Sequence, residues 1–504
     1  GLTSDTPIGM FLFFLSSGLF LGWSLGANDA ANVFGTAVGS RMIRFKTAAV
    51  LCSLFIILGA VISGSGATHT LGKLGTVNAL PGAFMVAFSA ALTVYLMTLA
   101  GYPVSTSQAI VGAILGWNFF SGSLTDYHSL VKIVSTWVLC PVLAAFFALM
   151  LYNLIGCIIR CCKIHMLMLD ATTRYGLVLA GIFGAFSLGA NNIANVMGVF
   201  VPVSPFADIT ILGLFSLSAS QQLFFIGGLA IALGVFTYSK RVMMTVGEGI
   251  FRLSPVAAFV VVMAHSLVLF LFASERLAYF LASHNLPTLP LVPVSSSQAI
   301  VGGIIGIGLL KKGRGLRWRM LGGISTGWVS TPVIACLVCY VSLFFLQNVF
   351  EQKTYKPVPY KLSVEAMERI RAQAPSLTKA LAPLEGEKYN TSAGFRSALH
   401  KQIDVSLDEE ALILASAELC FLRVKEQIVA ELDREWFSPE QIKALEKLQN
   451  TFYIHKWRLA QTLAALSPAW RFEEGHRFKN KDLENKLSYL YDRFQVEPST
   501  VHPS

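Results

Sequence analysis

The first 350 residues of this chain are mostly a series of apolar runs, each long enough to cross a lipid bilayer. A membrane-spanning helix needs roughly 20 consecutive apolar residues. Charged residues make up only 13% of the chain and hydrophobic residues 54%, so too few charges exist to cover the surface of a soluble protein. The sequence therefore predicts an all-α, polytopic membrane protein. The predicted spans are residues 8–33, 47–65, 82–99, 131–155, 175–200, 223–238, 255–273 and 321–346.

Two motifs occur twice, in the same order, among these apolar runs. The first copy reads Gly-Ala-Asn-Asp-Ala-Ala-Asn at residues 26–32 and Pro-Val-Ser-Thr-Ser-Gln-Ala-Ile-Val-Gly at 103–112. The second reads Gly-Ala-Asn-Asn-Ile-Ala-Asn at residues 189–195 and Pro-Val-Ser-Ser-Ser-Gln-Ala-Ile-Val-Gly at 293–302. Small polar residues at Gly and Pro breaks, repeated in two halves of a membrane protein, are typical of the binding site of a secondary transporter.

A third element extends the repeat beyond these motifs. Trp-Val-x-x-Pro-Val begins at Trp137 in the first copy and at Trp328 in the second. Three elements in one order at nearly one spacing indicate an internal duplication. We therefore expect transmembrane repeats at residues 1–163 and 164–349, with an insertion in the second repeat around residues 203–222.

Basic residues between the apolar runs indicate the topology. They gather in four clusters, at residues 41–46, 160–174, 240–252 and 311–319. If all four clusters face the cytoplasm, as the positive-inside rule requires, each half crosses the membrane an odd number of times and the two halves are inverted. The same rule explains the net charge of +10, so we predict no nucleic-acid partner. We expect a multi-pass protein of a cell membrane, with the bacterial inner membrane as its setting.

The segments that carry the two Ser-Gln motifs, 105–117 and 295–310, are too short or too Gly-rich for full spans. We expect re-entrant helical hairpins or broken helices there.

The last part of the chain, residues 350–504, is charged and is expected to form a small soluble helical domain. Apolar residues at helical spacing predict helices at 363–372, 407–432 and 439–466. Ser438 is the expected N-cap of the third helix. This domain shows no catalytic pattern, and its scattered histidines are expected to be exposed or hydrogen-bonded.

The Ser-Gln motifs suit an anion. A Ser followed three residues later by Gln is a capping box, which marks a helix start. A helix start offers unpaired backbone N–H groups and a partial positive charge, and hydroxyl and amide groups add donors for a tetrahedral oxyanion. The alternative is that these residues only cap broken helices. The candidate substrate ligands here are Ser105, Thr106, Ser107, Gln108, Ser295, Ser296, Ser297 and Gln298.

The Asn-rich motifs suit a cation. Asp29 is an ionisable residue deep in an apolar segment, and such residues usually face a cavity or an ion. A carboxylate with amide oxygens and no His or Cys suits Na⁺ or Mg²⁺, or a proton bound at the carboxylate. The alternative is that Asp29 caps a helix near the membrane interface. The candidate cation ligands are Asn28, Asp29, Asn32, Asn191, Asn192 and Asn195.

The stretch at residues 26–40 and the duplicated Pro-Val-Ser-x-Ser-Gln motif resemble the inorganic phosphate transporter (PiT) family over residues 8–348. The resemblance implies inverted repeats, a phosphate site at the membrane midplane, and symport with Na⁺ or H⁺. It adds Asn28, Asp29, Asn191 and Asn192 to the phosphate site, because they fall on the conserved Asn-Asp pairs. The Ser-Gln segments fall on two hairpin tips. Asn192 departs from the family, which usually has Asp there, and this puts sodium coupling in question.

We predict a secondary active transporter that moves inorganic phosphate with Na⁺ or H⁺ by alternating access across a lipid bilayer, with a homodimer as its expected assembly. The alternatives are a permease for sulfate or another tetrahedral oxyanion, and a phosphate-binding sensor that signals through the C-terminal domain. Phosphate can donate a hydrogen bond and sulfate cannot, so Asp29 as an acceptor favours phosphate. We expect no enzyme and no cofactor, because no Walker A loop, zinc spacing or Gly-x-Ser-x-Gly occurs and the eight cysteines form no metal framework.

Overall fold

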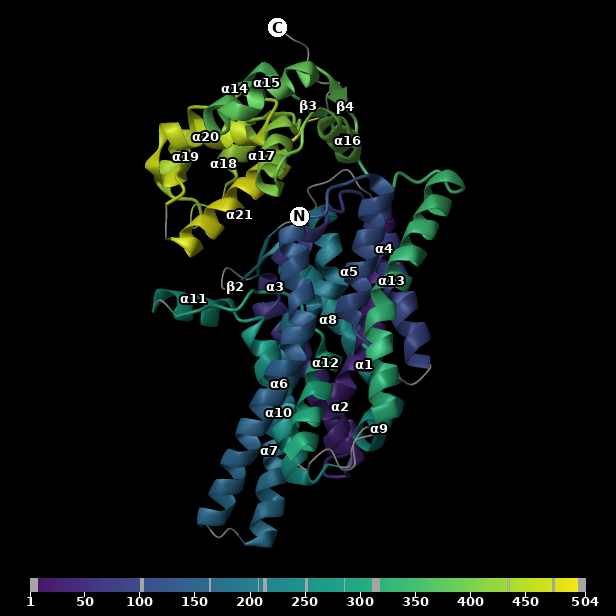
Figure 1. The fold of residues 1–504 in the computed structure, drawn as a ribbon. Helices are drawn as coiled ribbons and strands as arrows, with labels where there is room; N and C mark the ends of the chain where they lie inside the picture. Colours follow the sequence, from purple (N-terminus) through teal and green to yellow (C-terminus); the bar gives the residue numbers. More distant parts are fainter. Residues whose placement is uncertain are drawn as a thin grey trace. The chain divides into compact units, whose positions relative to one another are not determined.

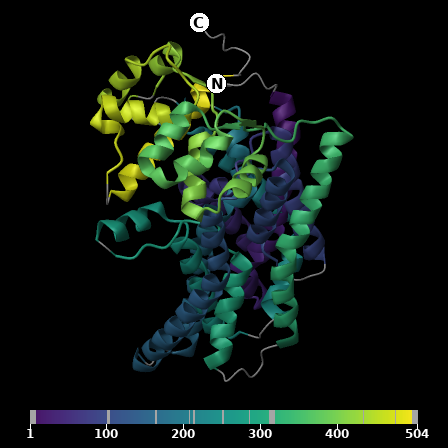
Figure 2. The same cartoon turned by 45° about the horizontal axis from the view of Figure 1, so that its top comes forward.

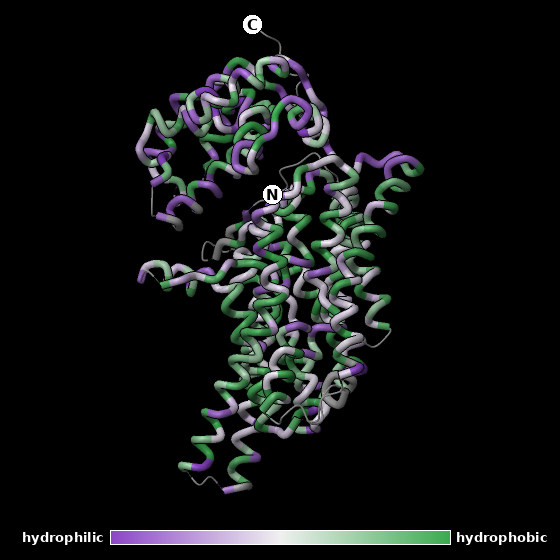
Figure 3. The backbone as a smooth tube through the Cα atoms, viewed as in Figure 1, coloured by the Kyte–Doolittle hydropathy of each residue, from purple (hydrophilic) through white to green (hydrophobic). Residues whose placement is uncertain are grey.

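The computed structural model of the protein divides into two compact units, Gly1–Lys356 and Pro357–Ser504. The first unit is largely apolar, whereas hydrophilic residues are frequent throughout the second (Figure 3). The structure describes residues 8–99, 104–162, 165–206, 208–211, 215–249, 253–284, 286–310, 318–432, 434, 436–473 and 476–496.

The first unit is a bundle of long apolar helices whose axes lie roughly along one common direction (Figures 1 and 2). Among the described residues, seven helices are long and apolar enough to span a membrane, and an eighth arises if the pair α10 and α11, bent by 71°, is one span. Each predicted span falls on one of them, which confirms a multi-span membrane protein. The helices are α1 (Ile8–Gly39), α2 (Phe45–Ser63), α4 (Leu80–Leu99), α6 (Tyr127–Cys162), α7 (Met166–Met197), α8 (Ala219–Thr237), α10 (Pro255–Leu271), α11 (Glu275–Ser283) and α13 (Trp318–Asn348).

Shorter helices complete this unit: α3 (Ser65–Leu74), α5 (Thr106–Ser121), α9 (Ser239–Gly249) and α12 (Ser296–Leu310). The helices α5 and α12 carry the Ser-Gln motifs, and each begins at a buried residue inside the bundle. α5 packs on α4 and α12 packs on α10. Both α5 and α12 are short helices, of 16 and 15 residues, and the re-entrant hairpins or broken helices expected at these two places remain predictions.

Close helix packing depends on glycines of the duplicated motifs. A Cβ at Gly112 of α5 would lie 2.1 Å from the carbonyl oxygen of Pro332 in α13, and one at Gly302 of α12 would lie 2.3 Å from that of Pro141 in α6. Each glycine ends a Ser-Gln motif and each proline belongs to the Trp-Val-x-x-Pro-Val of the other half. The third repeated element is therefore the surface on which the short helix of the opposite half packs.

The predicted basic clusters gather at one end of the bundle. The α1–α2 and α6–α7 connections, the start of α9 and the end of α12 all lie at the bottom of Figure 1. Within the clusters, residues 163–164, 250–252 and 311–317 lie outside the described residues.

The predicted insertion at residues 203–222 contains a small hairpin. The 3-10 helix η1 (Gly198–Val203) leads into β1 (Ile209–Ile211), which pairs antiparallel with β2 (Phe215–Leu217) in the register Ile209↔Leu217. Ser218 then caps α8 through a complete capping box with Gln221.

The second unit is mostly helical with short two-stranded ladders. Its helix predicted at 363–372 is confirmed as α14, whereas the predictions of continuous helices at 407–432 and 439–466 are wrong. Each breaks because a two-residue strand intervenes, β5 after α17 and β6 after α19. β5 pairs antiparallel with β6, and the buried Leu422 of β5 lies opposite Tyr453 of β6. Ser438 is the N-cap of α19, as predicted. The elements are β3 (Tyr360–Lys361), α14 (Val364–Gln373), η2 (Pro375–Leu377), α15 (Thr378–Leu381), η3 (Ala382–Leu384), β4 (Lys388–Tyr389), α16 (Ser392–Gln402), α17 (Leu407–Ala417), β5 (Leu422–Arg423), α18 (Glu426–Ala430), α19 (Pro439–Glu446), β6 (Phe452–Tyr453), α20 (Lys456–Leu466), η4 (Pro468–Trp470) and α21 (Arg477–Phe494).

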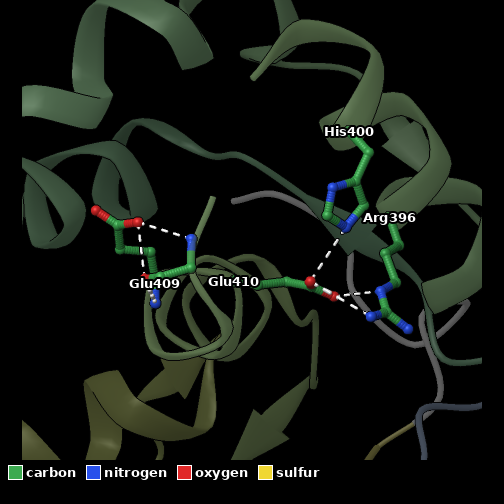
Figure 4. A network of polar contacts seen from close by, with 5 residues as sticks. Arg396, His400, Glu409 and Glu410 are labelled. Atoms are coloured by element: carbon green, nitrogen blue, oxygen red, sulfur yellow. Dashed lines mark hydrogen bonds and ion pairs between the residues drawn. The ribbon is translucent and has the colours of Figure 1, made fainter. Parts of the chain in front are cut away.

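Polar side chains within this unit have structural partners. The buried carboxylate of Glu410 in α17 pairs with Arg396 and accepts from His400 Nε2 at 3.1 Å, both from α16 (Figure 4). His455 contacts Ser363 Oγ through Nε2 at 2.7 Å and the Glu418 carbonyl through Nδ1 at 2.8 Å, and burial lowers its pKa. These histidines are hydrogen-bonded, as expected, and they hold helices together.

Candidate functional site

The duplicated motifs meet inside the first unit. The Asn-rich motifs lie within α1 and α7, and the Ser-Gln motifs form the first turns of α5 and α12. Every candidate residue is described and at most 3% exposed, while Pro103, which opens the first Ser-Gln motif, lies outside the described residues. The buried candidates are Asn28, Asp29, Asn32, Ser105, Thr106, Ser107, Gln108, Asn191, Asn192, Asn195, Ser295, Ser296, Ser297 and Gln298.

The helix starts have the predicted serine caps. Ser105 Oγ accepts from the Gln108 N–H at 3.2 Å, and Ser295 Oγ accepts from the Gln298 N–H at 3.2 Å. The reciprocal half of the capping box is not formed, since Oε1 of both glutamines is buried without a hydrogen-bond partner. The Oε1 atoms of the two glutamines therefore remain available to a ligand, which a complete capping box would prevent.

Hydrogen bonds join asparagines of each half to serines of the other. Asn32 Nδ2 donates to Ser296 Oγ at 3.0 Å, and Asn195 Nδ2 donates to Ser107 Oγ at 2.8 Å. Ser107 Oγ also donates to the Val294 carbonyl at 2.9 Å. The two Ser-Gln helices and the two Asn-rich helices thus form one polar cluster to which both halves contribute.

Asp29 lies inside this cluster and not at a helix end. It sits within the continuous 32-residue helix α1 and is 2% exposed, so the alternative of a helix cap near the interface is wrong. Its two carboxylate oxygens accept from Asn32 Nδ2 and Thr106 Oγ1, both at 3.4 Å. At the matching place in α7, Asn195 Nδ2 donates to Asn192 Oδ1 at 2.9 Å.

Two of the candidate asparagines hold the backbone or a neighbouring helix. Asn191 Nδ2 donates to the Val292 carbonyl at 2.9 Å, and its Oδ1 accepts from the Val294 N–H at 2.8 Å, which fixes the strand-like approach to α12. Asn28 Nδ2 donates to Thr98 Oγ1 at 2.9 Å. Asn191 thus has a clear positioning role in this conformation.

Several polar oxygens of the cluster have no partner among the residues that the structure describes. A buried acceptor without a hydrogen bond is costly and calls for an explanation such as a bound ion or water. The group consists of Asn28 Oδ1, Asn32 Oδ1, Asn195 Oδ1, Gln108 Oε1 and Gln298 Oε1.

Two residues of this site were not predicted from the sequence. His265 of α10 is fully buried, with Nε2 2.8 Å from Ser296 Oγ, and Thr98 of α4 contacts Asn28. A lone histidine in an apolar span was a usable signal, whereas Thr98 has no feature that separates it from other small polar residues. Within the described residues, no group of three or more His, Cys, Asp or Glu could hold a metal ion.

A multi-span bundle with one buried polar cluster built from duplicated segments defines a membrane transporter. Residues 25–339 match the model of the phosphate transporter family, with a further match at residues 277–466. The chain belongs to this family, and it is a transporter and not an enzyme.

The relatives and the solved structure below each match about two thirds of this chain. A protein of Methanocaldococcus jannaschii named "Putative phosphate permease" is 30% identical over 64% of this chain and 93% of its own length. "Sulfate permease CysP" of Bacillus subtilis is 31% identical over 65% of this chain and 86% of its own length. A solved structure titled "The sodium-dependent phosphate transporter" shares the fold with a TM-score of 0.54 at 22% identity, covering 67% of this chain and 99% of that one.

Ser105→Ala and Gln298→Leu are expected to weaken substrate binding without unfolding the protein. Each change removes a polar group at a helix start, and one such hydrogen bond contributes about 1–3 kcal/mol. The effect is measured as the apparent affinity for substrate during uptake into proteoliposomes. Wild-type affinity in both variants would rule out the helix starts as the anion site.

Proposed function

We propose that the protein is an ion-coupled phosphate symporter whose substrate binds where the Ser-Gln helix starts meet the Asn-rich helices. One observation carries this proposal: four segments, far apart in the sequence and drawn from both halves, converge in a buried polar cluster within a membrane bundle. A binding site shared between two halves is what alternating access requires, since relative motion of the halves can open it to either side.

The anion ligands we propose are the first turns of α5 and α12. The N–H groups at a helix start and the partial positive charge there favour an oxyanion. Thr106, Ser107, Ser296 and Ser297 add hydroxyls, and the side chains of Gln108 and Gln298 add amide groups whose Oε1 atoms have no partner among the described residues.

The cation ligands we propose centre on Asp29. The unpaired Oδ1 atoms of Asn28 and Asn32 belong to the same helix, and oxygen-only ligand sets suit Na⁺. Asn195 Oδ1 offers a further oxygen from α7, whereas both side-chain polar atoms of Asn191 are already hydrogen-bonded. A proton bound at Asp29 is the alternative coupling ion.

We also propose inverted repeats at residues 1–163 and 164–349, each with a re-entrant hairpin, α4–α5 and α10–α12. The reciprocal packing of Gly112 on Pro332 and of Gly302 on Pro141 supports a two-fold relation between the halves. The basic connections at one end of the bundle support a cytoplasmic location for that end. A cell-membrane location, a separate C-terminal domain from residue 350 and a homodimer remain predictions.

The test is uptake of radiolabelled phosphate and sulfate into proteoliposomes under imposed Na⁺ or H⁺ gradients. The similarity to a sulfate permease makes sulfate the second candidate substrate. Accumulation of phosphate under one gradient supports the symporter, and accumulation of sulfate alone supports the second candidate. Binding without flux would instead favour a sensor that signals through the C-terminal unit.

Asn192→Asp is expected to change the ion dependence of uptake. It places a second carboxylate beside Asn195 and Ser107, which both contact Asn192 Oδ1 now. An added carboxylate should raise cation affinity or bind a proton, since nearby anions raise each other's pKa. The Hill slope for Na⁺ and the pH profile of uptake measure this. Curves that overlay the wild type at equal expression would place residue 192 outside the ion site.

A further inference from the structure

His265 is a buried imidazole at the edge of the proposed anion site. It lies on α10 with no exposed surface, and its Nε2 is 2.8 Å from Ser296 Oγ at the start of α12. Its other ring nitrogen, Nδ1, is buried without a hydrogen-bond partner. No residue of the duplicated motifs is an imidazole, so His265 adds a group that the repeat does not supply.

The contact completes a chain of hydrogen bonds that starts at the carboxylate. Asp29 Oδ1 accepts from Asn32 Nδ2 at 3.4 Å, Asn32 Nδ2 also contacts Ser296 Oγ at 3.0 Å, and Ser296 Oγ contacts His265. This chain joins α1, α12 and α10.

A second chain of hydrogen bonds starts at the other Asn-rich motif and ends differently. Asn192 Oδ1 accepts from Asn195 Nδ2 at 2.9 Å, and Asn195 Nδ2 donates to Ser107 Oγ at 2.8 Å. Ser107 Oγ has two acceptors, the Val294 carbonyl at 2.9 Å and Asn192 Oδ1 at 3.3 Å. Ser107 holds the motif position of Ser297, so the contact between Ser296 and the imidazole has no counterpart in the second chain.

Ser296 Oγ has one hydrogen and two lone pairs, and one lone pair accepts from Asn32. The contact with His265 Nε2 uses the hydroxyl hydrogen when the imidazole carries its hydrogen on Nδ1, and the second lone pair when it carries it on Nε2. In the Nδ1–H tautomer one lone pair of Ser296 Oγ remains, so the serine can accept a hydrogen bond from a ligand and cannot donate one.

We propose that His265 carries its hydrogen on Nδ1 and is a specificity-determining positioning residue that makes Ser296 a hydrogen-bond acceptor, so that the site selects protonated oxyanions over fully deprotonated ones. A hydrogen phosphate carries a P–O–H that can donate to Ser296 Oγ, whereas sulfate at neutral pH has no hydrogen to donate. A buried acceptor that a ligand leaves unpaired discriminates strongly against that ligand. The proposal rests on the proposed substrate site and deepens it.

Binding and uptake of phosphate and of sulfate by the purified full chain test this role. His265→Asn shortens the side chain out of reach of Ser296, and His265→Gln keeps an amide oxygen near the Nε2 position. We expect His265→Asn to lower the phosphate-to-sulfate preference about tenfold, through weaker phosphate affinity and sulfate affinity that is unchanged or stronger. His265→Gln should retain most of the preference. Ser266→Ala is the matched control, because the neighbouring hydroxyl donates to the Val262 carbonyl at 2.7 Å, within α10.

A double variant separates positioning from a general packing effect. If His265 acts through Ser296, then His265→Asn should change the preference less than about twofold in a Ser296→Ala background. The proposal would be overturned if His265→Asn kept the wild-type phosphate-to-sulfate preference. It would also be overturned if the fold-changes of the two single variants multiplied in the double variant. Phosphate and sulfate binding, measured calorimetrically in detergent, gives the preference without any flux. A failure of coupled transport is therefore distinguishable from a failure of His265 to set the preference.

Discussion

Asp29→Asn is expected to abolish ion-driven accumulation of phosphate, a larger loss than any single serine substitution causes. Asp29 is the only carboxylate in the duplicated motifs, and it is buried among donors from α1 and α5. Asparagine has nearly the same shape, so the helix packing should persist while the negative charge that attracts a cation or proton is lost. Phosphate accumulation in proteoliposomes under Na⁺ and H⁺ gradients is the measurement.

A second aspartate gives a matched control for this change. Asp126 lies just before α6, where its Oδ1 accepts from the His128 N–H at 3.1 Å and its Oδ2 from Ser129 Oγ. Asparagine performs this capping role as well as aspartate does, so Asp126→Asn should transport like the wild type. If Asp29→Asn still accumulates phosphate against a gradient, the carboxylate is not the coupling group.

Gly302→Ala is expected to cause a large loss of folded protein. The added Cβ would lie 2.3 Å from the Pro141 carbonyl oxygen and 2.6 Å from its Cα. Both are backbone atoms of a packed helix, so α12 and α6 must move apart. Overpacking in a core costs about 1–3 kcal/mol even where side chains can adjust, and here they cannot.

The adjacent glycine is the natural comparison. At Gly303 an added Cβ would meet the Val261 side chain at 3.3 Å, and alanine is the better helix former by roughly 0.5–1 kcal/mol. Gly303→Ala should therefore keep a melting temperature and a size-exclusion profile in detergent close to those of the wild type. Gly302→Ala should have a lower melting temperature and a smaller peak of folded protein. Equal stability of the two variants would refute the close-packing role of Gly302.

Composition and periodicity sufficed for the membrane part of the fold. Apolar runs of about 20 residues have few alternatives to a spanning helix, because backbone groups must be hydrogen-bonded internally in lipid. The same logic marked Asp29 and the Ser-Gln motifs as site candidates, since polar groups persist in such segments only where they have partners. Periodicity failed in the tail at residues 418–425 and 447–455, where short strands pair between helices. Tertiary pairing overrides helical spacing there.

The partners within the site were decided by tertiary structure alone. Nothing in the spacing of residues along the chain states that Asn32 contacts Ser296, 264 positions away, or that Asn191 holds the approach to α12. His265 enters the site only because α10 packs beside α12 and turns one imidazole toward Ser296. The sequence by itself determined which segments are buried and polar, because burial in lipid is a local property of composition. Helix packing between the two halves determined which polar atoms meet and which remain free for a ligand, because those contacts depend on distances that no local pattern encodes.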